Sequence, residues 1–214
     1  MKYDTVIFDL DGTLLNTIDD LSDSLNEVLK RNGYRTIEVD EVRRFVGNGA
    51  RNLVILSLPE HTSEDNITKV FEEFKIHYKN NMQNKTRPYN GIMELLLDLH
   101  RYNYKIAIVS NKFDTAVKDL AQIYFGNLVR VAIGETNDIK RKPAPDSVFR
   151  AIKELGADLN RAILVGDSET DVRTAKNAGI PCIGVTWGFR SREVLRSEGA
   201  EYLIDTPREL LTII

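Results

Sequence analysis

Short apolar runs recur along the chain at intervals that leave room for a helix between them. Most of the runs are continuously apolar and do not alternate with polar residues, which is typical of strands buried on both faces of a parallel sheet. They comprise residues 5–8, 106–109, 129–133, 162–165, 182–185 and 202–204. Segments with helical periodicity follow these runs or separate them, near residues 91–102, 114–124, 145–155, 168–178, 190–197 and 207–213. This alternation predicts an α/β fold with a doubly wound, mainly parallel, Rossmann-like sheet.

One long segment interrupts the alternation. From about residue 16 to residue 85 the apolar side chains follow helical spacing, and no run indicates a convincing strand. Leu21, Leu25, Val28 and Leu29, for example, form one apolar stripe. We therefore expect a small all-helical cap, residues 16–85, inserted after the first strand into an α/β core made of residues 1–15 and 86–214.

Composition and charge argue against several classes of function. The chain has 214 residues, of which 42% are hydrophobic and 29% charged, an ordinary globular balance. A formal net charge of -3 gives no basic surface, so no nucleic-acid partner is expected. There is no signal-peptide pattern and no apolar stretch long enough to span a membrane, so we expect a cytoplasmic protein without a membrane partner, as a monomer or homodimer.

Two aspartates follow the first predicted strand directly, in the sequence Asp9-Leu10-Asp11-Gly12-Thr13. Open α/β sheets bind ligands beyond the carboxyl ends of their strands. Two carboxylates confined there cannot both stay ionised without a cation, and Mg²⁺ prefers oxygen ligands. Gly12 permits a tight turn and a close backbone approach, although Asp and Gly are also common in ordinary turns. This motif alone leaves the metal-site and turn interpretations about equally open.

A second acidic pair follows the predicted strand at residues 162–165. Asp167 stands where this strand ends, and Asp171 lies about one helical turn further on. Asp167 is placed to ligate the same metal, whereas Asp171 either ligates it or orients Asp167 and a water. Asp and Ser also cap helices, and we expect Ser168 to cap the helix near residues 168–178.

Three further residues are candidates for phosphate contacts. Ser110-Asn111 ends a predicted strand, where a hydroxyl and N–H groups at a helix start can cradle a phosphate, although such a pair is usually only a cap. Lys142 lies in the basic turn at residues 140–145, where two prolines restrict the backbone. An ammonium fixed in this way can hold a phosphate and offset the crowded carboxylates.

The four motifs together resemble those of the haloacid dehalogenase (HAD) superfamily. They are Asp-x-Asp-Gly-Thr, Ser-Asn, Lys-Pro-x-Pro and Gly-Asp-Ser-x-x-Asp, in this order, and they cover essentially the whole chain. A helical insertion after the first motif is similar to the small cap of that superfamily. Phe-Val-Gly-Asn-Gly-Ala-Arg at residues 45–51 and Val-Thr-Trp-Gly at residues 185–188 most resemble phosphoglycolate phosphatases.

The resemblance implies a Mg²⁺-dependent phosphatase that acts on a small phosphorylated metabolite. Asp9 would attack phosphorus and form an aspartyl-phosphate, and Asp11 would act as general acid and then general base. Mg²⁺ would be held by the Asp9 carboxylate, the Asp11 backbone carbonyl and Asp167, with Asp171 in support. The residues implied at the phosphoryl group are Ser110, Lys142, Asn111, Gly12 and Thr13.

The cap is expected to choose the substrate. Asn48 and Gly49 would point into the cleft and Arg51 would meet a substrate carboxylate, the alternative being a plain helix–loop–helix turn with a solvated arginine. Hydrolysis of 2-phosphoglycolate is favoured, while a β-phosphoglucomutase-like transfer and cleavage of inorganic pyrophosphate stay open because sequence does not fix cap geometry. A non-catalytic phosphate-binding protein is disfavoured, since Asp9 and Lys142 are both present.

Overall fold

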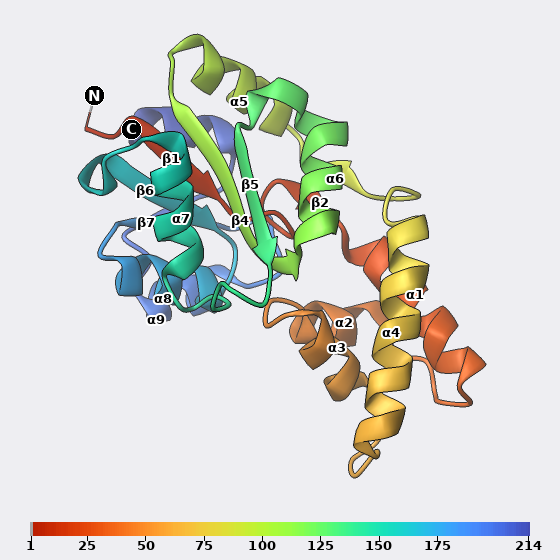
Figure 1. Cartoon of the computed structure of the whole chain (residues 1–214). Helices are drawn as coiled ribbons and strands as arrows, with labels where there is room; N and C mark the ends of the chain where they lie inside the picture. Colours follow the sequence, from red (N-terminus) through yellow and green to blue (C-terminus); the bar gives the residue numbers. More distant parts are fainter. Residues whose placement is uncertain (1) are drawn as a thin grey trace.

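A six-stranded sheet forms the centre of the computed structural model, which describes residues 2–214. Its strand order is β5-β4-β1-β6-β7-β8, and all neighbouring strands run parallel (Figure 1). The strands are β1 (Thr5–Phe8), β4 (Lys105–Phe113), β5 (Val131–Glu135), β6 (Ala162–Gly166), β7 (Cys182–Val185) and β8 (Tyr202–Ile204). They fall on the six apolar runs, which confirms the prediction of a doubly wound, mainly parallel α/β sheet.

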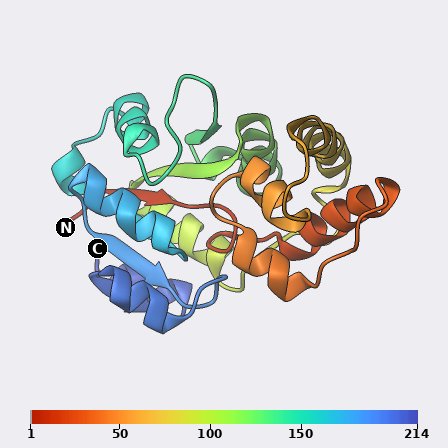
Figure 2. The ribbon, with the colours of Figure 1, turned by 90° about the horizontal axis from the view of Figure 1, so that it is seen from below.

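Helices cover both faces of this sheet (Figure 2). The helices are α5 (Ile92–Arg101) and α6 (Asp114–Phe125) on one face, and α7 (Asp146–Leu155), α8 (Glu169–Ala178) and α9 (Arg192–Glu198) on the other. Within β1, Val6 and Phe8 pack into the first apolar core and Ile7 packs into the second. Successive side chains of a strand point to opposite faces, so a strand covered on both sides must be apolar throughout.

Three short 3₁₀ helices complete the core: η1 (Gly126–Leu128), η2 (Leu159–Arg161) and η3 (Pro207–Thr212). The helical pattern near residues 207–213 thus corresponds to a 3₁₀ helix. The buried residues of η3 are Pro207 and Leu210, which stand three positions apart. That spacing matches the three residues per turn of a 3₁₀ helix.

Four helices form an insertion between β1 and β4, defined here as residues 18–81. They are α1 (Ile18–Arg31), α2 (Val39–Phe45), α3 (Ala50–Ser57) and α4 (Glu64–Asn81), and they lie beyond one end of the sheet (Figure 1). Leu25, Val28 and Leu29 are fully buried, so the stripe read from the sequence is the packing face of α1. The helical character predicted for this segment is confirmed.

Two very short strands carry the chain into and out of the helical insertion. β2 (Leu15–Asn16) pairs antiparallel with β3 (Arg87–Pro88). β2 reaches one residue into the segment 16–85, for which no convincing strand was predicted, because a two-residue strand has no alternation that a sequence pattern can show. The pairing places the two crossings side by side.

The helices of the described residues 2–214 are not suited to a bilayer, since none combines the length and apolar character that a membrane span requires. The longest is α4 with 18 residues, and it carries charged side chains from its first turn to its last.

A buried carboxylate fastens the return crossing to the insertion. Asp20 on α1 is 1% exposed and accepts hydrogen bonds from the backbone nitrogens of Lys85 and Thr86, each at 2.9 Å, and from Thr86 Oγ1 at 2.8 Å. Hydrogen bonds to an ionised acceptor are stronger than those between neutral groups, and a buried donor that loses its acceptor is costly. Asp20 therefore fixes where the chain leaves the insertion.

We expect Asp20→Asn to lower the free energy of unfolding by about 2 kcal/mol, because the new amide presents N–H groups to donors that need an acceptor. Urea unfolding followed by circular dichroism measures this change. The matched control is Asp23→Asn, since Asp23 is exposed and meets only the Lys85 Nζ at 2.7 Å. Equal effects of the two substitutions would contradict a fastening role for Asp20.

Candidate active site

The candidate site forms where three adjacent strands end at the same edge of the sheet. Phe8, the last residue of β1, lies level with Ile108 of β4 and Val165 of β6. Asp9 follows β1 and donates its backbone N–H to the Val165 carbonyl at 2.9 Å, which fixes the start of its side chain. The chain adds β4 and β5 on one side of β1 and then β6, β7 and β8 on its other side. This strand order brings residues remote in sequence together at the strand ends.

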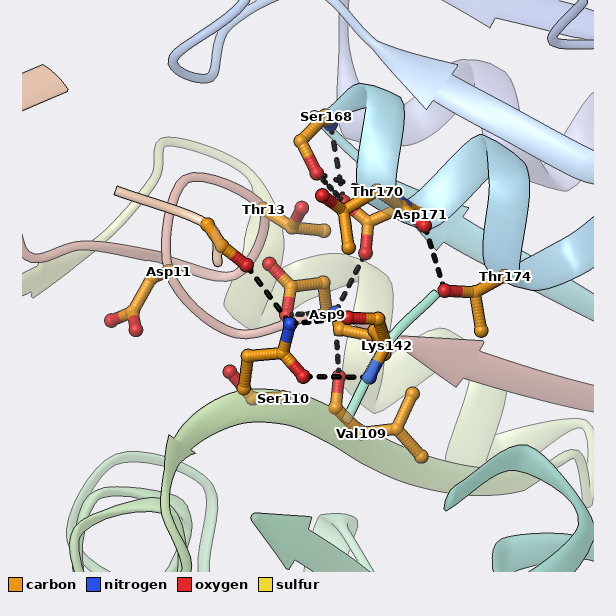
Figure 3. A network of polar contacts seen from close by, with 12 residues as sticks. Asp9, Asp11, Thr13, Val109, Ser110, Lys142, Ser168, Thr170, Asp171 and Thr174 are labelled. Carbon is orange, nitrogen blue, oxygen red and sulfur yellow. Dashed lines mark hydrogen bonds and ion pairs between the residues drawn. The ribbon is translucent and has the colours of Figure 1, made fainter. Parts of the chain in front are cut away.

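Lys142 occupies the centre of the site (Figure 3). Its Nζ donates to Asp9 Oδ1 at 2.7 Å, to Asp171 Oδ1 at 2.7 Å and to the Val109 carbonyl at 3.1 Å. Asn111 holds the loop behind it, since its side chain accepts from the Lys142 backbone nitrogen at 2.8 Å and donates to the Lys142 carbonyl at 2.9 Å. With its bonds to Asp9, Asp171 and Val109, the Lys142 ammonium has an acceptor for each of its three N–H donors.

Three buried carboxylates share the space around this one ammonium. Oxygen atoms of Asp9, Asp167 and Asp171 lie within 4.8 Å of one another. Burial raises the pKa of Asp9 to about 7 against the opposing charge of Lys142, and burial together with the charges of Asp171 and Asp9 raises the pKa of Asp167 well above its ordinary value. Burial lowers the pKa of Lys142, but the charges of Asp171 and Asp9 outweigh it and the net shift is upward. The cluster thus carries more negative charge than its lysine neutralises.

Asp167 sits in a space that only glycines leave open. Its carboxylate accepts from the Phe189 backbone nitrogen at 2.7 Å and from Thr13 Oγ1 at 3.2 Å. A Cβ atom on Gly12, whose φ is +88°, would lie 2.4 Å from Asp167 Oδ2, and one on Gly188 would lie 2.3 Å from Asp167 Cβ. Both glycines therefore permit the close approach of backbone to carboxylate, and Thr13 serves Asp167 with its hydroxyl.

Asp171 has both carboxylate oxygens engaged by the protein. Oδ1 accepts from Lys142, and Oδ2 accepts from the Ser168 hydroxyl at 2.6 Å and the Ser168 backbone nitrogen at 3.1 Å. Ser168 also accepts from the Asp171 backbone nitrogen, which makes a capping box at the start of α8. The predicted cap is confirmed, and Asp171 is placed to orient Lys142.

The Asp11 carboxylate is separate from this cluster (Figure 3). It accepts two hydrogen bonds from Lys112 Nζ, at 2.9 and 3.0 Å, and one from Thr17 Oγ1 at 2.7 Å. The side chain of Lys112 is only 3% exposed. Asp11 thus faces the helical insertion, where the group leaving the phosphate would lie if Asp9 attacks phosphorus.

A cavity of about 50 Å³ lies between the strand ends and the helical insertion. Asp9, Ser110 and Lys142 line it from the sheet, whereas Val46, Gly47, Gly49, Leu53, Phe74 and Tyr78 are among the residues that line it from the insertion. Asn111 also donates to the Gly47 carbonyl at 3.0 Å, so the loop before α3 is held against the phosphate end. A cavity of this size holds a few waters or a small ligand.

The predicted cap residues separate into two groups. Gly49 lines the cavity. Asn48 is not among the lining residues, and its side chain instead accepts from Thr170 Oγ1 at 3.3 Å. Arg51 is not among the lining residues either, and its guanidinium pairs with Glu64 at the beginning of α4. The expectation that Arg51 meets a substrate carboxylate is thus not supported by its position, since its charge already has a partner at the surface.

Arg190 connects the helical insertion to the core, and the sequence analysis did not identify it. Its guanidinium donates to the carbonyls of Arg43 at 2.7 Å and Val46 at 2.8 Å, and to Glu169 Oε2 at 2.9 Å. It thereby binds the carbonyl end of α2, which a helix leaves unsatisfied, to the first turn of α8. No pattern marks Arg190, because its role depends on how the insertion meets the sheet.

Lys112 and Tyr78 were also missed. Lys112 had a detectable signal, since it follows Ser110 by two positions and alternate residues of a strand share a face. Tyr78 gave none, because it stands among the apolar residues of α4 at ordinary helical spacing.

The donor set fits a hard divalent cation. The oxygen atoms of Asp9 and Asp167 are close, buried and short of positive charge, and their raised pKa values show that the protein alone does not stabilise both as anions. Carboxylate oxygens are the ligands that Mg²⁺ and similar ions prefer. The site therefore combines a buried carboxylate facing an ammonium, a place for a cation, and a second carboxylate toward the insertion, which together suit phosphoryl transfer.

Comparison with known proteins agrees with this arrangement. Residues 6–185 match the family model described as haloacid dehalogenase-like hydrolase. The chain is 36% identical to a phosphoglycolate phosphatase of Mesorhizobium japonicum, with 92% of this chain and 89% of that protein covered. It is 37% identical to a phosphoglycolate phosphatase of Agrobacterium fabrum, with 86% and 80% covered.

A solved structure extends the similarity to three dimensions. The crystal structure from Lactobacillus delbrueckii subsp. bulgaricus, which carries the provisional name phosphoglycolate phosphatase, matches with a TM-score of 0.94 at 35% identity, covering 100% of this chain and 99% of that one. These similarities confirm the resemblance drawn from the four motifs. The chain therefore belongs to the haloacid dehalogenase-like hydrolase family, within which it is an enzyme of the phosphatase type.

Proposed function

We propose that this enzyme is a Mg²⁺-dependent phosphatase that hydrolyses 2-phosphoglycolate through an aspartyl-phosphate on Asp9. The observation that carries the proposal is the position of Asp9, buried at a strand end against the Lys142 ammonium and lining the cavity with Asp167. Its carboxylate has the surroundings that a nucleophile attacking a phosphate dianion requires, because nearby positive charge offsets the repulsion.

Each protein group has a separate task in the proposed reaction. Asp9 forms the bond to phosphorus as the ester oxygen leaves, and Asp11 gives that oxygen its proton and later takes one from the attacking water. Ser110 and the strand-end backbone hold the phosphoryl oxygens, and the Lys142 ammonium offsets their charge from its place beside Asp9. Asn111 keeps the Lys142 loop in place.

Mg²⁺ would be held by the carboxylates of Asp9 and Asp167 and by the Asp11 backbone carbonyl. Asp171 supports this set by orienting Lys142, since both of its oxygens already have partners. A bound divalent ion would offset the charge of the phosphoryl group and of the carboxylates that surround it.

The preference for 2-phosphoglycolate is supported by the names of the two relatives at 36% and 37% identity and by the small volume of the cavity, about 50 Å³. In the proposal, residues 16–85 act as a cap over a core of residues 1–15 and 86–214. The cap helices supply the apolar wall on the leaving-group side, which excludes water from the reacting bond.

We expect Asp9→Asn to lower the rate of phosphate release by about 10³-fold or more, because the amide is a poor nucleophile. With ³²P-labelled 2-phosphoglycolate and Mg²⁺, an acid quench of the parent protein should leave a protein-bound label that hydroxylamine removes. Asp9→Asn should carry no such label, whereas the exposed control Asp119→Asn should behave as the parent. A rate in Asp9→Asn above a tenth of the parental rate would exclude Asp9 as the nucleophile.

The substrate is tested separately with a panel of 2-phosphoglycolate, β-glucose 1-phosphate and inorganic pyrophosphate. We expect the highest kcat/KM for phosphate release from 2-phosphoglycolate. Isomerisation of the sugar phosphate would instead indicate a mutase, and faster cleavage of pyrophosphate would indicate a pyrophosphatase. The Asp9 assignment stands in all three cases, since each reaction uses the same nucleophile.

The metal assignment is tested by stability. The pKa of Asp167 is raised on folding, so the folded parent binds more protons than the unfolded chain above pH 3.8 and its free energy of unfolding falls as the pH rises. Asp167→Asn has no such titration, so in EDTA its Tm relative to the parent should increase from pH 5 to pH 8. Added Mg²⁺ should raise the Tm of the parent but not that of the variant.

Thermal unfolding followed by circular dichroism measures both effects, again with Asp119→Asn as the control. Equal Mg²⁺-dependent increases in Tm for the parent and Asp167→Asn would show that Asp167 does not hold the ion.

A further inference from the structure

Apart from the Asp11 carboxylate, the end of the cavity nearest the insertion is apolar, with two exceptions. Leu21, Leu53 and Phe74 form much of this wall, while Lys112 and Tyr78 bring an ammonium and a hydroxyl to it. Neither group belongs to the phosphate end, which is built around Lys142. A ligand group that reaches this wall would therefore meet polar partners at one point only.

Lys112 is the lining cation at the insertion end of the cavity, and it keeps unused hydrogen-bonding capacity. Lys142 spends its three donors on Asp9, Asp171 and the Val109 carbonyl, and Arg190 is bound to Glu169 and to carbonyls of the insertion. Both hydrogen bonds of Lys112 go to the single carboxylate of Asp11. An ammonium has three N–H donors, so Lys112 keeps one for a further acceptor.

The Tyr78 hydroxyl stands beside this ammonium without a hydrogen-bond partner in residues 2–214. Tyr78 is 1% exposed, and the Lys112 Nζ lies 4.5 Å from the centroid of its ring. A buried hydroxyl without a partner is costly and is uncommon in proteins. Burial also raises the pKa of Tyr78 to about 12, so the group is a neutral phenol that can donate a hydrogen bond.

We propose that Lys112 and the Tyr78 hydroxyl together bind an anionic group, a carboxylate, on the leaving-group part of the substrate. This inference rests on the proposed phosphatase function, because Asp9 and Asp11 define where the phosphoryl group and the leaving oxygen lie. The ammonium supplies the charge, and the phenol supplies the second donor to the same carboxylate. Arg51, to which the sequence analysis gave this role, is paired at the surface instead.

The spacing selects a short substrate. The leaving oxygen must lie against Asp11 to receive its proton, and Lys112 is hydrogen-bonded to that same carboxylate at 2.9 and 3.0 Å. A carboxylate that Lys112 reaches from there is separated from the ester oxygen by very few atoms. In 2-phosphoglycolate a single methylene carbon lies between them, which suits this geometry.

The apolar wall of the cavity also favours a small acidic substrate. Leu21, Leu53 and Phe74 offer no hydrogen-bond partner to the hydroxyls of a sugar, which would be desolvated without compensation. They also keep water from the ion pair of Lys112 with a bound carboxylate, and such a pair is stronger where water is excluded. The site therefore favours a small phosphorylated acid over a phosphorylated sugar.

The test compares 2-phosphoglycolate with 2-hydroxyethyl phosphate, an ester of similar size without the carboxylate. The measured quantity is the ratio of the two kcat/KM values, so a general effect on Asp11 cancels. Lys112→Met should lower this ratio about 10- to 100-fold, and Tyr78→Phe, which removes only the hydroxyl, should lower it about 5-fold. Lys112→Arg should restore part of the ratio, and the exposed control Lys118→Met should leave it unchanged.

Two results would overturn the inference. If Lys112→Met slows both esters by the same factor, Lys112 only positions Asp11, and the phosphatase function stands without the carboxylate site. If the parent releases phosphate from neither ester, the proposed function fails and the inference fails with it. If circular dichroism shows that Lys112→Met does not fold, the inference is tested with Tyr78→Phe and Lys112→Arg. For these variants the ratio of the kcat/KM values for 2-phosphoglycolate and 2-hydroxyethyl phosphate is measured in the same way.

Discussion

The crowding of three buried carboxylates around one ammonium is the constraint on which the rest of this structure depends. These carboxylates bring more negative charge than Lys142 offsets, and the raised pKa values of Asp9 and Asp167 express this shortage. The fold maintains the crowding at a cost in stability, with each carboxylate held by a strand end or a helix cap. A site that is short of positive charge before binding is one that a divalent ion stabilises when it binds.

The sheet that maintains this crowding was predictable because it is encoded by strong local patterns. Largely apolar runs identified all six strands, since burial on both faces favours apolar side chains at successive positions. The β2–β3 pair was not predictable, because two residues carry no periodicity. The form of η3 was missed as well, since a buried pair three positions apart is compatible with either kind of helix over so short a segment.

The site was predictable to the extent that its residues follow strands. Asp9 and Asp167 follow β1 and β6, so the sequence places them at one edge of the sheet, where both line the cavity. Ser110 lines it too, but the prediction that Ser110-Asn111 ends its strand is wrong, since β4 continues to Phe113. Arg190 and Tyr78 depend on how the helical insertion meets the sheet, and that geometry is long-range packing that no local pattern records. The same limit explains why the expectation for Arg51 was not supported. An arginine suits a substrate carboxylate, but this one is paired with Glu64.

The division between strand ends and insertion also separates two chemical tasks. Groups that handle phosphorus come from the sheet and are fixed by short hydrogen bonds, as Lys142 is by Asn111. The groups proposed to meet the rest of the substrate come largely from α1, α3 and α4. The Arg190 guanidinium binds the end of α2 to the core. Lys112 is the exception, since it projects from β4 and yet faces α4 through the ring of Tyr78. It therefore connects the two tasks, because the same ammonium touches the carboxylate proposed to move the proton and the wall proposed to select the leaving group.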